Sequence, residues 1–179
     1  MANYVCYPVT KIEDRFVFDV VVPTGATYHA GQVVSLKTIS TSITRNTTVF
    51  TGEAPTTIAS DKMAIVINGG FEQLSDGRRP AGQPDFTQYT YAAGEVVTVI
   101  ALDSYMRFVI SKDAITEAVT GDFKKASYLY PATTSNTLVC DDTVSATAIQ
   151  QLNLLAMYNF RTGGNFGGGF ATSAIAMVL

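Results

Sequence analysis

The stretch that decides the fold runs from residue 94 to residue 111 and reads GEVVTVIALDSYMRFVIS. β-Branched and aromatic residues predominate in 95–102 and again in 106–110, a composition typical of β-strands. A glycine precedes the first run, and Ser104 and Tyr105 separate the two runs. We therefore predict two strands, the second pairing with the first. Ser111 is a suitable N-cap residue, so we expect a short helix over 112–119 to follow.

Apolar runs of the same kind recur along the rest of the chain. The segment 143–158 combines helical spacing with alternation, which favours a short helix or loop and then a strand. Residues 38–48 are rich in threonine and are expected to form a loop or an edge strand. Further strands are predicted at 16–22, 32–37, 63–67, 128–130, 137–140 and 174–179, with 128–130 and 137–140 forming a hairpin.

These patterns predict a mainly β protein, with a small β-barrel or sandwich-like fold and one or two short helices. We take 1–179 as a single β-rich domain. Two small subdomains that meet near 85–90 are the alternative organisation.

Charged residues are scarce in this chain. They make up 15% of the sequence, against about 25% in typical globular domains, while 47% of the residues are apolar. A surface with so few charges suits a chain that buries much of itself in an assembly. The formal net charge of −3 argues against a nucleic-acid binder, which needs a basic face.

The two cysteines and the start of the chain bear on where the protein is made. Cys6 and Cys140 are too few for a secreted disulfide scaffold, so we expect buried free thiols and synthesis in a reducing cytoplasm. We find no signal peptide and no apolar run long enough to span a membrane, and therefore expect a protein that is soluble when made.

Residues that carry chemistry are few and poorly grouped. His29 is the single histidine, and no nucleophile motif accompanies it. Neighbouring carboxylates occur at 13–14 and 141–142, where turn and cap roles are expected, with a weak calcium site at Asp141 and Asp142 as the alternative. The glycines of 163–169 lack the lysine and the helix of a phosphate loop. We expect no catalytic residue, no cofactor and no metal.

Partner contacts are the remaining candidate function. The exposed loop 75–85 holds a basic pair that suits an acidic patch, although solvated loop charges are the alternative. Tyrosines near strand ends suit interfaces, although core and sheet-face positions are the alternative. The uncharged segment 162–179 needs pairing in a sheet or a subunit contact to avoid aggregation. Our candidate contact residues are Arg78, Arg79, Tyr89, Tyr91, Phe166 and Phe170.

The stretch 86–100, FTQYTYAAGEVVTVI, resembles the middle region of head decoration proteins of tailed bacteriophages. In those proteins an "aGe-V-V" turn and strand lead to a "Phe-x-Ile-Ser" strand and a short acidic helix, which correspond here to 107–111 and 112–115. Residues 126–131 are similar to the family's "G-x-Y-L-x-P" hairpin start, with Ala126 in place of glycine, and 31–34 resemble a shorter version of the first motif. The motifs cover about half of the chain. The loop 75–85 and the glycine-rich end depart from the family pattern.

The resemblance implies a virion structural protein, made in the bacterial cytoplasm, that binds the outer capsid surface and stabilises the shell. Its partners would be the major capsid protein and copies of itself on the lattice, with trimers among the possible arrangements. Nucleic acid and membranes are not expected partners. The alternative is a carbohydrate- or receptor-binding β module of a virion appendage, a head fibre or a tail component, with Tyr89 and Tyr91 as its binding rings.

Overall fold

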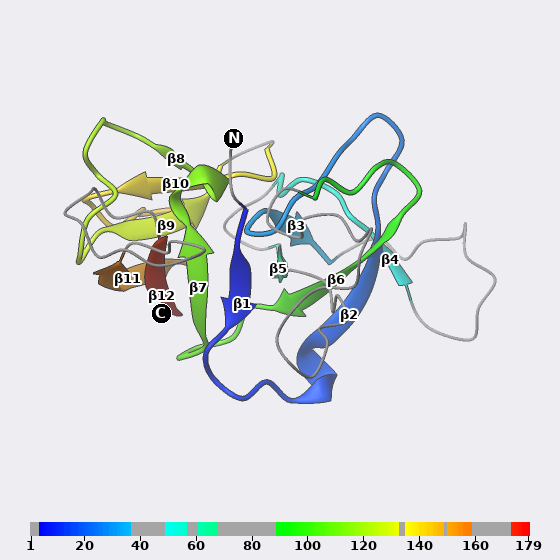
Figure 1. Ribbon diagram of the computed structural model, residues 1–179, viewed down its shortest axis with the longest axis horizontal. Coiled ribbons are helices and arrows are strands. Elements are labelled where there is room, and N and C mark those ends of the chain that lie inside the picture. The colour runs from blue at the N-terminus through cyan, green and yellow to red at the C-terminus, as the bar shows by residue number, and fades with distance from the viewer. Residues whose placement is uncertain are drawn as a thin grey trace, which may run out of the picture.

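The structure is a computed structural model that describes residues 4–36, 49–56, 61–67, 89–132, 135–148, 150–158 and 173–179 (Figure 1). It is mainly β, as predicted, and its helices are two short 3₁₀ turns within the described ranges. The elements are β1 Cys6–Pro8, η1 Asp14–Phe16, β2 Val17–Val21, β3 Val33–Ser35, β4 Val49–Thr51, β5 Met63–Val66, β6 Val96–Ala101, β7 Arg107–Ser111, η2 Lys112–Ala114, β8 Ile115–Glu117, β9 Tyr128–Pro131, β10 Leu138–Asp141, β11 Leu152–Tyr158 and β12 Ser173–Val178.

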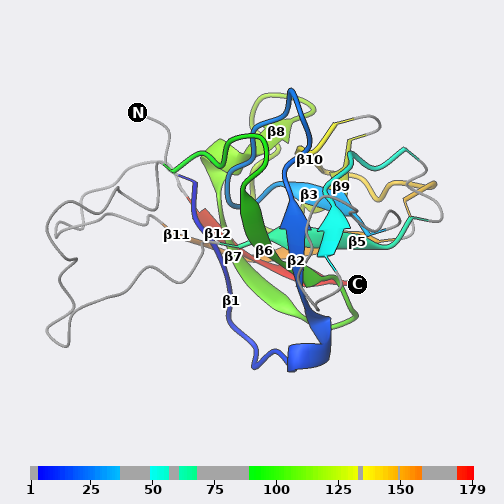
Figure 2. The same cartoon turned by 90° about the vertical axis from the view of Figure 1, so that its right-hand side faces the viewer.

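The strands form two curled sheets that lie next to each other in Figure 1. The large sheet has seven strands in the order β1-β7-β12-β11-β9-β10-β8, and the small sheet has five in the order β3-β5-β6-β2-β4. In Figure 2 the small sheet faces the viewer and strands of the large sheet cross behind it. Each sheet curls into a half-barrel, which agrees with the predicted fold class.

The expected pairing of 95–102 with 106–110 is wrong. Both runs are strands, but β6 lies between β5 and β2 in the small sheet, while β7 lies between β1 and β12 in the large sheet. A strand with both edges occupied has no donors or acceptors left for a hairpin partner. The connection instead passes the chain from one sheet to the other, through a left-handed Tyr105 with φ 67° whose N–H donates to Val178 O at 2.9 Å.

The small sheet closes around its own apolar interior. Ser35 N donates to Glu53 O at 2.9 Å, which links the two ends of the sheet. Alternate residues of the strands point inward, and at the centre the hydroxyl of the fully buried Tyr28 donates to Gly52 O. This inner cluster consists of Val20, Val22, Tyr28, Val34, Ala64, Val66, Val97 and Val99.

A second and larger core lies between the two sheets. The small sheet contributes side chains from the opposite face of the same strands, such as Met63, Ile65 and Ile100. The large sheet contributes the core-facing residues of β7, β9, β10, β11 and β12, with Phe108 and Ile110 among the largest that are fully buried. Since one cluster contains residues of both sheets, the sheets are packed as one unit around it. The alternative from the sequence was two subdomains that meet near 85–90. In the structure the chain passes from the small sheet to the large sheet at 102–106, because β6 still belongs to the small sheet.

The end of the chain is paired on both sides, as its lack of charge requires. β12 lies between β11 and β7, and Ala174, Ala176 and Val178 are in the shared core. The predicted hairpin of 128–130 with 137–140 is confirmed as β9 and β10. In the segment 143–158 the strand begins at Leu152, and the described residues before it form no helix.

The helix expected over 112–119 is wrong. Residues 112–114 form one 3₁₀ turn, and β8 follows at once, parallel to β10. Ser111 does not cap this turn, because its hydroxyl accepts a hydrogen bond from Val5 N at 2.9 Å. The predictions for 38–48, 75–85 and 163–169 lie outside the described residues.

Gly31, just before β3 of the small sheet, packs against η2 and β7 at the large sheet. Its φ is +91°, and a Cβ built there would lie 2.6 Å from the Cβ of Ala114. Gly25 has a similar φ of +82° but open space around it. Substitution of Gly25 tests backbone strain alone, whereas substitution of Gly31 adds steric overlap to the same strain.

We predict that Gly31→Ala lowers the free energy of unfolding by about 2–4 kcal/mol, because left-handed strain adds to overpacking. Gly25→Ala is expected to lower it by only about 1–2 kcal/mol, through strain alone. Urea denaturation of the two variants measures the difference. Equal losses would contradict the close approach of the sheets at Gly31.

Candidate docking surface

The large sheet has an outer face that points away from the shared core. On β7 and β12 the core takes Phe108, Ile110, Ala174 and Ala176. Because successive side chains of a strand point to opposite faces, Val109 and Ile175 belong to the outer face. The same alternation assigns the outward residues of the neighbouring strands.

One row of paired residues crosses this face from β7 to β10. Strand register places Arg107 beside Met177, Met177 beside Asn153, Asn153 beside Tyr128, and Tyr128 beside Asp141. The row has a positive charge at one end, a negative charge at the other, and uncharged side chains between. Facing pairs on adjacent strands lie about 5 Å apart, so the charged ends are separated by about 20 Å.

Further rows add apolar and aromatic side chains to the same face. Tyr7, Ile175 and Ala156 lie on this face of β1, β12 and β11, whereas Val109 of β7, which pairs with both Tyr7 and Ile175, is only 2% exposed and adds no accessible surface. Tyr130 and Val139 pair on β9 and β10. Tyr7 is 38% exposed, and Ile175, Met177, Tyr128 and Tyr130 are partly exposed.

This composition is unusual for the solvent side of a sheet. Along each strand the residues that face solvent are normally polar or charged, and they alternate with apolar residues that face the core. Tyr, Met and Arg are the residue types enriched in protein interfaces, whereas Lys, Glu and Asp are depleted there. We therefore take the outer face of the large sheet as the candidate docking surface. Because the sheet curls around its core, this surface is convex.

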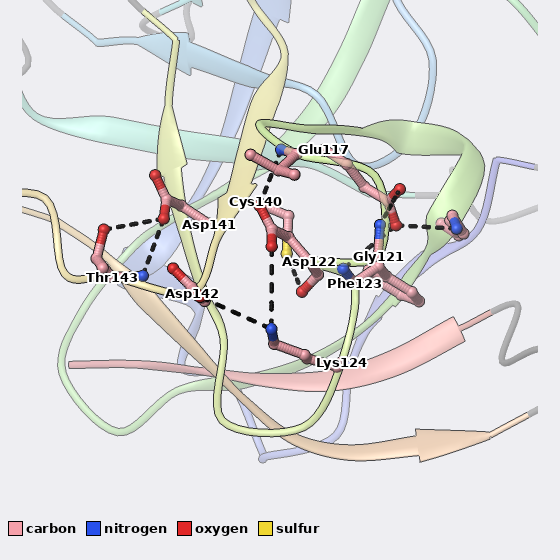
Figure 3. A network of polar contacts seen from close by, with 11 residues as sticks. Glu117, Gly121, Asp122, Phe123, Lys124, Cys140, Asp141, Asp142 and Thr143 are labelled. Carbon is pink, nitrogen blue, oxygen red and sulfur yellow. Dashed lines mark hydrogen bonds and ion pairs between the residues drawn. The ribbon is translucent and has the colours of Figure 1, made fainter.

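A network of polar contacts fixes the connection from β8 to β9, beside this face (Figure 3). Glu117 at the end of β8 receives Lys112 Nζ at 2.9 Å, with Oε1 also accepting Phe123 N and Oε2 accepting Gly121 N, both at 3.2 Å. The contact with Lys112 is the main cause that lowers the pKa of Glu117, and the two backbone donors act in the same direction. The ionised carboxylate of Glu117 thus holds the loop in place.

Asp122 provides a second anchor in the same loop. It is buried, its Oδ2 accepts Val119 N at 2.9 Å, and its own N–H donates to Val119 O at 3.0 Å. The thiol of Cys140 donates to Asp122 O at 3.3 Å, which ties the loop to β10. Lys124 Nζ lies 4.0 Å from Asp122 Oδ1 and 3.8 Å from Asp142 Oδ2 (Figure 3).

The pair Asp141 and Asp142 has a turn and ion-pair role. Asp141 Oδ1 accepts the backbone N–H and the hydroxyl of Thr143, both at 2.9 Å, and Tyr130 OH donates to Oδ2 at 3.1 Å. The hydrogen bond from Thr143 N is the largest cause that lowers the pKa of Asp141. Among the described residues no group of three His, Cys, Asp or Glu side chains is arranged to hold a metal ion.

The candidate contact residues from the sequence are not on the docking surface where the structure describes them. Tyr89 and Tyr91 precede β6 of the small sheet and form an edge-to-face pair with ring centroids 4.9 Å apart. Tyr89 OH donates to Glu95 Oε1 at 2.8 Å, and the backbone of Tyr91 pairs with that of Tyr28. Arg78, Arg79, Phe166 and Phe170 lie outside the described residues.

His29 and the cysteines occupy packed positions. The ring of His29 stacks on Tyr4 with centroids 3.6 Å apart, and burial is the main cause that lowers its pKa. Both cysteines are buried free thiols, as expected. Burial raises the pKa of Cys140 to about 12 and that of Cys6 further still, so both remain protonated.

Sequence reasoning missed most of the docking surface, namely Arg107, Tyr128, Tyr130, Asn153, Ile175 and Met177. The alternation of Tyr128, Leu129 and Tyr130 was the available signal, because it indicates two tyrosines on one face of a strand.

No helix among the described residues is long and apolar enough to cross a membrane. Comparisons with protein-family models, with curated proteins and with solved structures give no match.

We predict that Glu117→Gln lowers the free energy of unfolding by about 1–2 kcal/mol at pH 7, because it removes a charged acceptor from three donors. A carboxyl whose pKa is lowered in the folded state stabilises the protein above its unfolded pKa of about 4.3, and this stabilisation is lost as the pH falls through the folded pKa. The difference between wild type and variant should therefore shrink below about pH 4.3. Urea denaturation at a series of pH values measures it.

Glu13→Gln is the matched control, since Glu13 contacts Arg15 at 2.8 Å but both side chains are well exposed. Exposed pairs contribute little to stability, so this variant should match wild type at every pH. A Glu117→Gln variant that behaves in the same way would show that the Glu117 contacts do not hold the loop.

Proposed function

We propose that this chain is a virion structural protein of a tailed bacteriophage, which binds the outer capsid surface and stabilises the shell. The observation that carries the proposal is the outer face of the large sheet, where the uncharged side chains of Met177, Asn153 and Tyr128 lie in one row between Arg107 and Asp141. The motifs at 86–100, 107–115 and 126–131, which resemble those of decoration proteins, are the reason for proposing the capsid as the partner.

The geometry of the face suggests how it would bind. A convex sheet fits a concave site on its partner. Burial of the tyrosines and of Ile175 and Met177 would supply most of the binding free energy, while Arg107 and Asp141 at the rim would fix the orientation. Because many copies bind one lattice, each contact needs only moderate affinity to brace the shell. The partners would be the major capsid protein and neighbouring copies of this chain.

A carbohydrate- or receptor-binding module is the second candidate, and one observation favours it. Tyr128 lies between Asn153 and Asp141 on the outer face, so a ring that can stack on a sugar has polar groups on both sides. Asn153 Nδ2 is already engaged with Ala126 O at 3.3 Å, which leaves fewer groups for a sugar. The capsid proposal therefore ranks first.

Sedimentation of the purified protein with empty shells of the phage that encodes it tests the proposal. Saturable pelleting at a fixed ratio to the major capsid subunit is the expected result. Protein that remains in the supernatant, together with binding to a glycan array, would overturn the capsid proposal in favour of the second candidate.

We predict that Met177→Lys weakens shell binding by about tenfold or more, because it replaces an apolar contact of the docking surface with a second positive charge beside Arg107. Val96→Lys is the matched control, since Val96 is 46% exposed on a strand of the small sheet. The control should pellet like wild type. Equal pelleting of both variants would exclude the outer face as the binding site.

A further inference from the structure

The small sheet contains one sequence motif twice. Residues 27–34 read TYHAGQVV and residues 90–97 read TYAAGEVV, so the two stretches differ only at their third and sixth positions. In each stretch the final pair of valines begins a strand, β3 in the first and β6 in the second. Short matches also arise by chance, so the backbone geometry of the two stretches has to decide whether they are equivalent.

The two stretches fold into the same turn. In the first stretch Gln32 N donates to His29 O at 3.3 Å, and in the second Glu95 N donates to Ala92 O at 3.1 Å. The glycine at the third position of the turn has a φ of +91° in the first stretch and +88° in the second. A hydrogen bond across four residues with a positive φ at the third is the geometry of a type II turn.

The sixth residue of each stretch closes its turn a second time, through its side chain. Gln32 Oε1 accepts His29 N at 3.0 Å, and Glu95 Oε2 accepts Ala92 N at 2.5 Å. Glutamine and glutamate side chains have the same length and both end in an acceptor oxygen, so either can make this bond. The two stretches therefore differ in sequence at this position but keep the same hydrogen bond.

Each stretch also pairs in the same way with a valine at the end of a neighbouring strand. In the first stretch Gly31 N donates to Val66 O, and Val66 N donates to Gln32 O, both at 2.8 Å. In the second stretch the equivalent glycine N–H donates to Val22 O, and Val22 N donates to Glu95 O, both at 2.9 Å. The donors, the acceptors and their order are thus identical in the two stretches.

The strand pairing is crossed between the two halves of the small sheet. β2 precedes the first stretch but pairs with β6 of the second, whereas β5 precedes the second stretch and pairs with β3 of the first. The two stretches also meet directly, because Tyr28 and Tyr91 exchange backbone hydrogen bonds of 3.0 and 2.7 Å. Equivalent side chains belong to or pack against the same inner cluster, namely Val20 and Ala64, Val22 and Val66, Val34 and Val97, and Tyr28 and Tyr91.

We infer that the small sheet is built from two copies of one unit, a strand followed by a doubly closed turn and a second strand. The first copy consists of β2, the turn 29–32 and β3, and the second of β5, the turn 92–95 and β6. The copies have exchanged their first strands, as identical elements do in domain-swapped dimers. Gln32 and Glu95 are equivalent positioning residues, because each holds the turn of its own copy. The inference does not depend on the proposed function.

The large sheet packs against only one of the two copies at the turn. A Cβ built at Gly31 would lie 2.6 Å from the Cβ of Ala114, whereas one built at Gly94 meets no described atom within 4 Å. In the same way Val33 is fully buried, while Val96 at the equivalent position is 46% exposed. The copies therefore differ in what packs against them and agree in how they are built.

Amide hydrogen exchange with residue resolution tests whether the two turns are equivalent. Gln32→Glu and Glu95→Gln interchange the closing side chains, and each should leave exchange of the N–H that it accepts, that of His29 or of Ala92, within about twofold of wild type. Gln32→Ala and Glu95→Ala remove the acceptor and should speed exchange of the same N–H about fivefold or more. Thermal unfolding shows whether each variant is folded.

Slow exchange in both interchanged variants, together with faster exchange in both alanine variants, supports the duplication. Faster exchange in only one alanine variant or in neither would overturn it, since the two turns would then be held differently. An interchanged variant that exchanges as fast as its alanine counterpart would overturn it too. The double variant Gln32→Glu with Glu95→Gln keeps the composition of the chain and should fold; if it fails to fold while both alanine variants do, the two copies are not equivalent.

Discussion

The rest of the structure depends on the apolar core that the two sheets share. Ile100 of the small sheet and Phe108 of the large sheet both belong to it, although they are close in sequence and lie in different sheets. β6 has to be apolar on both faces, because Ile100 points into the shared core while Val97 and Val99 point into the small sheet. Gly31 before β3 lies so close to Ala114 that a methyl group there would overlap it. With its inner face in this core, the large sheet has its other face turned away from the small sheet.

The sequence was sufficient for the positions of most strands but not for their pairing. Local composition at 95–102 and 106–110 predicted both strands, because β-branched residues suit extended backbone regardless of the neighbour. Pairing is decided by contacts far apart in sequence, and β7 takes β1 and β12, about a hundred and about seventy residues away. The hairpin of β9 and β10 was predictable because its strands are joined by a short connection. The helix after Ser111 failed because Ile115 and Glu117 are held by pairing with β10, and such tertiary pairing overrides local capping signals.

The candidate site was even less accessible from the sequence than the fold. The outer face is defined by register, and the row from Arg107 to Asp141 joins residues of five strands. Alternation within one strand cannot show that Met177 and Asn153 are neighbours. The low content of charge predicted a surface that suits a partner without indicating where on the fold it would lie. Tyr89 and Tyr91 were chosen because tyrosines suit interfaces, yet their contacts belong to the turn before β6.

The proposed capsid contact rests on the outer face of the large sheet. A face of Tyr, Met and aliphatic side chains supplies contact area with few charges to desolvate. Such a face fits the proposed attachment to a repeating protein surface, for which moderate affinity at each copy is sufficient.

Hydroxyl-radical footprinting of side chains, read by mass spectrometry with and without shells, tests the docking surface most directly. The account predicts that oxidation of Tyr7, Tyr128 and Met177 falls on binding, while that of Tyr89 and Tyr91 does not change. Protection of Tyr89 and Tyr91 with unchanged oxidation of the outer face would contradict it.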